Sequence, residues 1–135
     1  MESNDYQTQA MRTDDGKMGA RIRHKLDEEF FNEATLKGSI DGVNDVGGLI
    51  YAALSLGGES GEVVEIIKKW VGQGAALDKA HLTEELGDVL WSVAKICDSI
   101  DVYMSDVMTQ NIDKLWKRYP DGFDVERANN RGMIS

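Results

Sequence analysis

The sequence predicts an all-α protein, most simply an antiparallel bundle of helices. Three observations support this prediction. Apolar residues recur every three or four positions over long stretches, Pro120 is the only proline, and no stretch alternates between apolar and polar residues as a half-buried strand does. Helices can therefore run through most of the 135 residues, which is the length of one domain.

We expect a single domain over residues 1–135, with N-terminal helices at 4–37, a core at about 45–120 and a C-terminal tail at 121–135. Within the N-terminal part, a short helix in residues 1–13 precedes a polar, glycine-containing break at 14–19. Apolar residues spaced by four then predict a second helix at about 20–37, and residues 38–44 have the composition of a loop.

Residues that commonly cap helices mark where the core helices begin. Asn44 or Asp45 precedes a long apolar run that extends to Val71, where a Gly-Gln-Gly segment ends it. Asp78 precedes the next run, which extends to about Ser99. These two runs are the longest predicted helices of the chain.

The last predicted helix begins at Asp101 or Ser105 and ends at Tyr119, because Pro120 disfavours helical backbone in the residue before it. The tail after Pro120 shows no periodicity, and no element is predicted there.

Charge and composition exclude some classes of function. The net charge of −9 argues against binding a nucleic-acid polymer, which needs a basic surface. No apolar run approaches the length of a membrane span, and the first residues do not resemble a signal peptide. The single cysteine, Cys97, is expected to be a small core residue. We therefore expect a protein of the cytoplasm.

Two pairs of acids carry the strongest functional signal. Glu59 and Glu62 lie three residues apart in one long run, and Glu85 and Asp88 lie three apart in the next. Because each residue turns a helix by about 100°, both pairs border the apolar stripe of their own helix. Stripes packed together would bring four carboxylates to one edge of the core, where unpaired charges are costly. This arrangement predicts a bound cation.

The identity of the ligands selects the cation. Carboxylate oxygens favour Mg²⁺, with Mn²⁺ as a second candidate, over zinc. His24 and His81 have no helix-spaced His or Cys partner and are expected at the surface. An alternative without metal also remains open, in which Lys114 and Arg118 neutralise the acids through salt bridges.

The last helix supplies hydrogen-bond donors at its own stripe border, namely Asn111, Lys114 and Arg118. Acidic helices beside a basic helix edge could hold a magnesium–polyphosphate complex. The sequence has no phosphate-binding GxxxxGK[ST] loop, and no serine has a credible His and Asp partner. Attack by a metal-activated water, with a carboxylate as proton acceptor, is then the expected chemistry.

Three segments together resemble the MazG-like nucleotide pyrophosphohydrolases, a family of all-α NTP pyrophosphatases. They are Leu56–Val63 (LGGESGEV), Glu84–Trp91 (EELGDVLW) and Asn111–Phe123 (NIDKLWKRYPDGF), which appear in the family's order. The resemblance covers about Leu49 to Arg131.

The resemblance implies hydrolysis of a nucleoside triphosphate to the monophosphate and pyrophosphate. It also implies dimers or tetramers with sites near subunit interfaces, in the cytoplasm of a bacterium or of a phage-infected cell. The acids would be catalytic Mg²⁺ ligands, and four residues of the last helix would lie near the phosphates: Glu59, Glu62, Glu85 and Asp88 for the metal; Asn111, Lys114, Arg118 and Tyr119 for the phosphates.

The chain departs from its relatives at two places. Some of them carry an extra acid where this sequence has Gly58, so the general base would be one of the ligands or Glu84. Residues 14–46 also form a longer stretch than in minimal relatives, which would serve as a lid, an interface or part of the base pocket.

Two alternatives accompany this prediction. The enzyme could be specific for one substrate, such as dUTP, dCTP or phosphoribosyl-ATP. From a different class, the chain could be a non-catalytic helical oligomerisation module, whose acids pair with Lys114 and Arg118 across a subunit contact.

Overall fold

The computed structural model describes residues 1–35 and 41–130, and within them the protein is all-α, as predicted. The described part contains six α-helices, one 3₁₀ helix and no strand. The end of the predicted second helix at 36–37, part of the predicted loop (38–40) and residues 131–135 lie outside this description. The elements are α1 (Ser3–Ala10), η1 (Met11–Thr13), α2 (Met18–Thr35), α3 (Val46–Gly72), α4 (Lys79–Ser99), α5 (Met104–Arg118) and α6 (Val125–Asn129).

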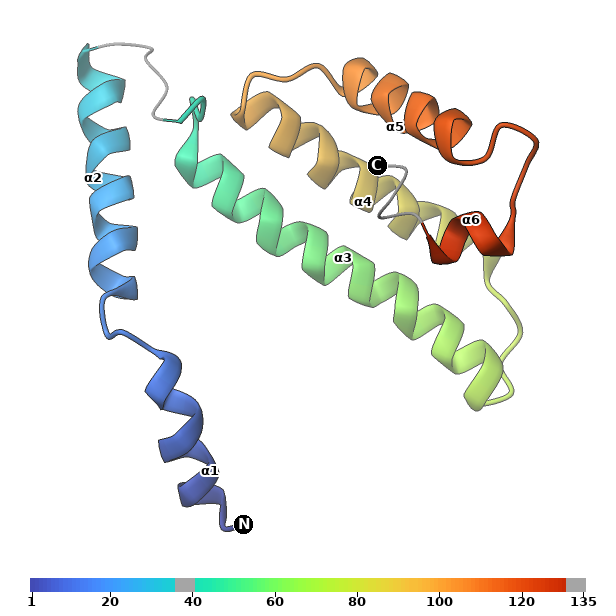
Figure 1. The fold of residues 1–135 in the computed structure, drawn as a ribbon, viewed down its shortest axis with the longest axis horizontal. Coiled ribbons are helices and arrows are strands. Elements are labelled where there is room, and N and C mark those ends of the chain that lie inside the picture. The colour runs from blue at the N-terminus through green and yellow to red at the C-terminus, as the bar shows by residue number, and fades with distance from the viewer. Residues whose placement is uncertain (36–40, 131–135) are drawn as a thin grey trace.

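Helices α3 and α4 form the centre of the fold and run side by side in opposite directions (Figure 1). Both begin at predicted caps. The Asp45 carboxylate accepts a hydrogen bond of 2.8 Å from the backbone N–H of Gly48, and Asp78 accepts one of 3.0 Å from that of His81. These bonds satisfy backbone donors that have no partner within the helix.

Small side chains line the contact between α3 and α4. Ala52, Ser92 and Ser99 have no exposed surface, and Cys97 is buried, as predicted. Each serine hydroxyl donates to the backbone carbonyl four residues earlier, so burial leaves neither hydroxyl without a partner. The two helices can therefore approach closely along the side that carries the acids.

An ion pair joins the start of α3 to the end of α4. The Lys95 ammonium lies 2.9 Å from the Asp45 carboxylate. Gly48 lies against both side chains, and a Cβ atom there would clash with the Asp45 carboxylate and approach the Lys95 Cε atom to 2.8 Å. The absence of a side chain at Gly48 lets this contact form.

Helix α5 follows α4 and lies beside it (Figure 1). Its N-cap is Tyr103, so the predicted starts at Asp101 and Ser105 were both wrong. Asp101 instead takes a left-handed backbone conformation, with φ of 56°, in the turn between the helices. The short helix α6 was not predicted, because a single capped turn is too short to show a periodicity. Asp124 caps it by accepting a 3.0 Å bond from the N–H of Arg127.

The N-terminal helices stand apart from this centre. In Figure 1, α1 continues away from α2, and only α2 comes near the start of α3. An ion pair of 2.9 Å between Lys25 and Asp41 spans this approach. The break predicted at 14–19 is shorter than expected, because α2 begins at Met18.

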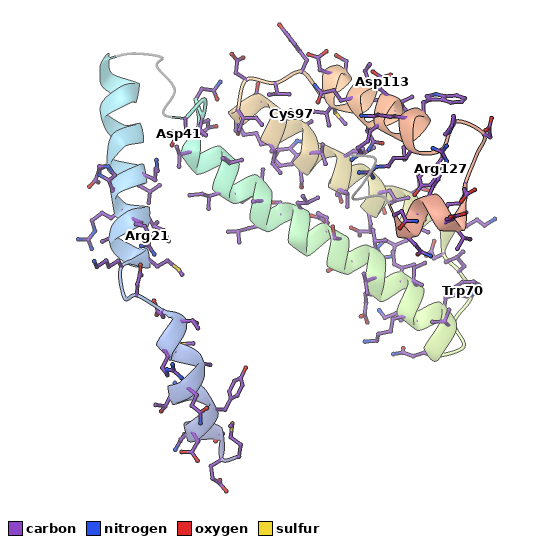
Figure 2. The ribbon with its side chains drawn as sticks, viewed as in Figure 1. Arg21, Asp41, Trp70, Cys97, Asp113 and Arg127 are labelled. Atoms are coloured by element: carbon purple, nitrogen blue, oxygen red, sulfur yellow. The ribbon has the colours of Figure 1, made fainter. Side chains whose placement is uncertain are left out.

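Much apolar surface is left uncovered. The chain exposes 10839 Å², whereas a compact monomer of its mass would expose about 7,000 Å². Only Ala52, Ile66 and Cys97 are buried apolar residues in the described part, and Figure 2 shows side chains projecting freely along most helices. None of the described helices is long and apolar enough to cross a membrane.

Candidate metal centre

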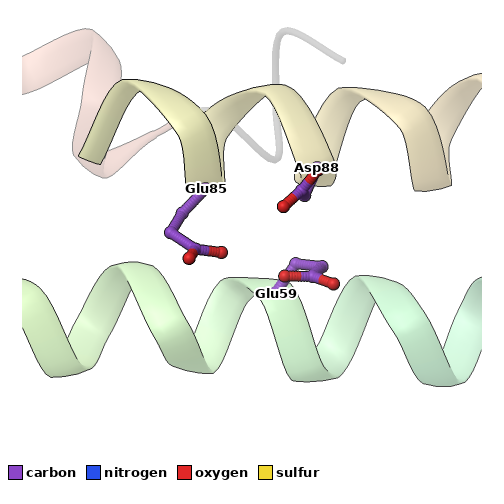
Figure 3. Close-up of side chains that lie close together, drawn as sticks. All are labelled: Glu59, Glu85 and Asp88. Carbon is purple, nitrogen blue, oxygen red and sulfur yellow. The ribbon is translucent and has the colours of Figure 1, made fainter. Parts of the chain in front are cut away.

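Three of the four predicted acids meet between α3 and α4. Glu59 projects from α3 towards Glu85 and Asp88 on α4 (Figure 3). Carboxylate oxygens of the three residues all lie within 4.8 Å of one another. Glu59 and Glu85 are partly buried, whereas Asp88 is exposed, so the group is open to solvent on one side.

The packing of the helices explains this meeting. Glu59 and Ala52 lie about 20° apart around the axis of α3, so close packing at Ala52 brings Glu59 up against α4. On α4, Glu85 lies beside the stripe of Leu82 and Val89, both partly buried, and only 14% of its side chain is exposed. The acids therefore reach the edge of the helix contact because they border the apolar stripes.

The proximity of these acids raises the pKa of Glu59 above its ordinary value. Partial burial is the largest cause, because it removes water that would stabilise the carboxylate. The hydrogen bond with Glu85 and the negative charges of Asp88, Glu85 and Glu62 act in the same direction. A proton or a cation relieves this repulsion.

His81 lies next to the group of acids, a position that was not predicted. Its Nε2 atom is 2.9 Å from Oε1 of Glu85, one turn along α4. His81 is exposed at the surface, as predicted, and the spacing of a histidine and an acid by four is the signal that could have identified the pair.

The donor set fits a hard divalent cation. Oxygen ligands at about 2.1 Å in an octahedron lie about 3.0 Å apart at neighbouring corners and about 4.2 Å apart at opposite ones. The three carboxylates, within 4.8 Å of one another, need only small side-chain rotations to reach such spacings. With three acids, no cysteine and an open side for water, Mg²⁺ or Mn²⁺ suits the group better than zinc.

Glu62 lies outside this group of three. It is exposed on α3, and its charge is near enough to contribute to the raised pKa of Glu59. Position around the helix does not explain the difference, since Glu62 and Asp88 are each turned about 60° from the other acid of their pair, away from the apolar stripe. The packing of the two helices brings Asp88 to Glu59 and leaves Glu62 outside the group.

The predicted phosphate-binding residues are on α5 and at its end, away from the contact between α3 and α4 (Figure 1). Asn111 and Lys114 are exposed, while Arg118 and Tyr119 are partly buried. Within the described residues, no ion pair joins Lys114 or Arg118 to any of the four acids. The Nε atom of Arg118 is buried without a hydrogen-bond partner in the same part of the chain.

Aromatic and apolar side chains surround the end of α5. Ile112, Leu115, Trp116 and Tyr119 line a shallow hollow there. The rings of Tyr119 and Phe123 lie 5.7 Å apart between their centroids and are tilted by 36°. The donors of Lys114 and Arg118 therefore stand beside an apolar surface.

Comparisons with known proteins identify a family over the part of the chain that contains this site. A family model, described as the MazG nucleotide pyrophosphohydrolase domain, matches residues 51–123, which include all four acids and the donors of α5. The chain is also similar to a curated protein named "Gene 37 protein" from Mycobacterium phage L5. The two are 34% identical over 92 residues, which cover 65% of this chain and 81% of the relative. No solved structure matches the chain.

Proposed function

The chain belongs to the MazG nucleotide pyrophosphohydrolase family, and from this we propose that it hydrolyses nucleoside or deoxynucleoside triphosphates to the monophosphate and pyrophosphate, with Mg²⁺. The observation that carries the proposal is the meeting of Glu59, Glu85 and Asp88 within the matched region. A cluster of carboxylates with a raised pKa at its centre is suited to a cation that arrives with a polyphosphate.

The reaction joins water to the α-phosphorus and breaks the bond from that phosphorus to the oxygen that bridges to the β-phosphate. Pyrophosphate leaves with the bridging oxygen, and the proton of the water passes to an acceptor on the protein. When bound, Mg²⁺ would lower the pKa of water and neutralise charge on the phosphates.

We assign Glu59, Glu62, Glu85 and Asp88 as the acids that hold the ion. Glu62 would turn towards the group of three when a cation offsets the repulsion among them. The proton acceptor would be one of these carboxylates or Glu84, which is exposed beside Glu85 on α4.

The donors of α5 would bind the phosphates and orient the triphosphate. Lys114 and Arg118 provide positive charge and hydrogen bonds, while Asn111 and Tyr119 provide neutral donors. The buried Nε atom of Arg118 has a donor capacity that the described residues do not use. These assignments place charge recognition on α5 and metal binding on α3 and α4.

We also propose that the protein is a homo-oligomer, located in the cytoplasm. The chain exposes roughly 3,800 Å² more than a compact monomer of its mass. Obligate interfaces bury about 2,000 to 5,000 Å² in total, so this excess is sufficient for one.

Release of pyrophosphate from a panel of NTPs and dNTPs, with and without Mg²⁺, tests the proposed reaction. We expect Mg²⁺-dependent release by the wild-type protein and loss of release in Glu59→Gln and Asp88→Asn. Asp98→Asn is the matched control, because it makes the same charge change on α4 at a position where 79% of the side chain is exposed. Absence of activity in the wild type, or full activity in both variants, would refute the proposal.

The same panel separates the alternatives. One dominant substrate would indicate a narrow-specificity enzyme acting on dUTP, dCTP or phosphoribosyl-ATP. A non-catalytic oligomerisation module would release no pyrophosphate and would have no reason to bind Mg²⁺ in the low-millimolar range.

A further inference from the structure

Helix α3 has a second apolar side, opposite the one that packs against α4. Ile50, Leu54, Gly57, Gly61 and Val64 lie within about 40° of the direction opposite Glu59. Lys68 lies in the same direction one turn after Val64 and ends this apolar run. We call these five residues the outer face of α3. A helix that is apolar on opposite sides is normally covered on both.

The protomer leaves this outer face uncovered. The exposed fraction is 42% for Ile50, 72% for Leu54 and 64% for Val64. In Figure 1, α4 and α5 lie to one side of α3, and α1 and α2 stand apart from most of its length. Contacts within the described chain therefore do not account for the apolar residues at these positions.

The two glycines at the middle of the outer face support the same conclusion. Glycine within a helix costs about 1 kcal/mol relative to alanine. A Cβ atom added at Gly57 or Gly61 would meet no atom of the described residues within 4 Å, so nothing in that part of the protomer requires their small size. Both lie on the side of α3 that faces away from the acids, which excludes the metal centre as the reason.

We infer that the outer face binds the same face of a second copy of this chain, so that the two α3 helices cross about a two-fold axis near Gly57. This inference rests on the homo-oligomer proposed above and names its interface. The excess exposed area of roughly 3,800 Å² belongs to the whole chain, with α1, α2 and α5 included, and is larger than a stable dimer needs. Leu54 and Val64, which are 72% and 64% exposed, place part of this area on the outer face.

The spacing of residues makes the outer face complementary to itself. Leu54 and Gly61 lie at equal distances along α3 from the peptide between Gly57 and Gly58. In an antiparallel crossing centred on that peptide, Leu54 packs over Gly61 of the partner subunit, and the reverse contact follows by symmetry. A large side chain then meets a small one at each facing position, which allows close packing.

Measurement of mass in solution tests the interface in the full chain. We expect light scattering after gel filtration to give an oligomer for the wild type and at most half that mass for Leu54→Lys, with helical content unchanged by circular dichroism. Gln110→Lys introduces the same charge at an exposed position on the polar side of α5 and should leave the mass unchanged. A monomeric wild type, or an unchanged mass for Leu54→Lys, would overturn the inference.

Gly61→Ala provides a second test, since it adds a single methyl group and favours the helix. If the partner packs against Gly61, dimer dissociation should occur at a concentration about tenfold or more higher than for the wild type. Unchanged dissociation with a higher melting temperature would show that nothing approaches Gly61 and would overturn the crossing. Dissociation by Trp116→Lys but not by Leu54→Lys would place the interface on α5 instead and would also overturn it.

Pyrophosphate release, measured on the same samples, separates this inference from the proposed activity. If the wild type is active but Leu54→Lys leaves the mass unchanged, the interface is refuted and the proposed activity is retained. If the wild type is inactive but Leu54→Lys lowers the mass of the oligomer, the proposed activity is refuted and the interface is retained.

Discussion

The imidazole of His81 and the carboxylate of Glu85 are hydrogen-bonded at 2.9 Å, one turn apart on α4. The same carboxylate belongs to the group in which oxygens of Glu59, Glu85 and Asp88 lie within 4.8 Å of one another. A partner of this kind fixes the direction of a ligand, and the loss of such a partner commonly weakens metal binding.

We predict that His81→Ala weakens binding of Mn²⁺, used as a spectroscopic substitute for Mg²⁺, by about tenfold. His81→Gln should restore much of the affinity, because its side-chain amide can donate from a position close to that of Nε2. His24→Ala, which changes an exposed histidine on α2, is the control. Equal affinity of His81→Ala and wild type, measured by electron paramagnetic resonance, would contradict a positioning role.

Mg²⁺ should stabilise the wild-type protein against heat, and EDTA should reverse the effect. Binding to the folded state at a concentration 100 times the dissociation constant adds about 2.7 kcal/mol to the free energy of unfolding. Asp88→Asn should lose this response while melting no lower than the metal-free wild type, because it removes a charge from a group of like charges.

Asp98→Asn, measured alongside by scanning calorimetry, should keep the full Mg²⁺ response. If Asp88→Asn instead melted lower than wild type without metal and still responded to Mg²⁺, the acids would act as a structural network.

The free energy of unfolding of the metal-free protein should fall as the pH rises from near the ordinary pKa of a glutamate side chain towards neutrality. The raised pKa of Glu59 means that the folded chain binds this proton more tightly than the unfolded chain. The resulting stabilisation is complete below the unfolded pKa and is lost as pH rises through the folded one.

Glu59→Gln cannot ionise at this position, so its melting temperature should rise relative to that of wild type over the same pH interval. Saturating Mg²⁺ should remove the decline in the wild type. Parallel melting curves for the two proteins at all pH values would argue against a raised pKa.

Asp45 should contribute to stability both as a cap and through its ion pair with Lys95. Asp45→Ala loses both contacts and should lower the free energy of unfolding by about 1 to 2 kcal/mol. Asp45→Asn keeps the cap, because asparagine caps as well as aspartate, and should lose only the smaller contribution of the ion pair. Urea denaturation measures the difference, and equal losses in the two variants would mean that the cap contributes nothing.

The donors of α5 should affect the substrate without affecting the metal. Lys114→Ala should lower kcat/KM roughly tenfold or more, because it removes a charge-assisted hydrogen bond to phosphate. Its affinity for Mn²⁺ should match that of wild type. Lys117→Ala, which removes the same charge from an exposed position of α5, should leave kcat/KM nearly unchanged.

The sequence alone determined the helical class, the cap at Asp78, a second cap at Asn44 or Asp45, and the acids that border each apolar stripe. These are local properties, since capping needs only a side chain near a helix end and periodicity gives the direction of each residue around its own axis. The motif spacing also indicated the family, and the comparison confirmed it.

Only the tertiary structure decided which side chains meet across two helices. It brought Glu59 to Glu85 and Asp88, left Glu62 at the surface, and showed that the outer face of α3 has no cover within the described chain. The physical reason is that periodicity specifies direction around one axis but not the height at which two helices pack or the distance between them. Those quantities depend on the small residues at the contact, such as Ala52 and Ser92, and on the partner that each face receives.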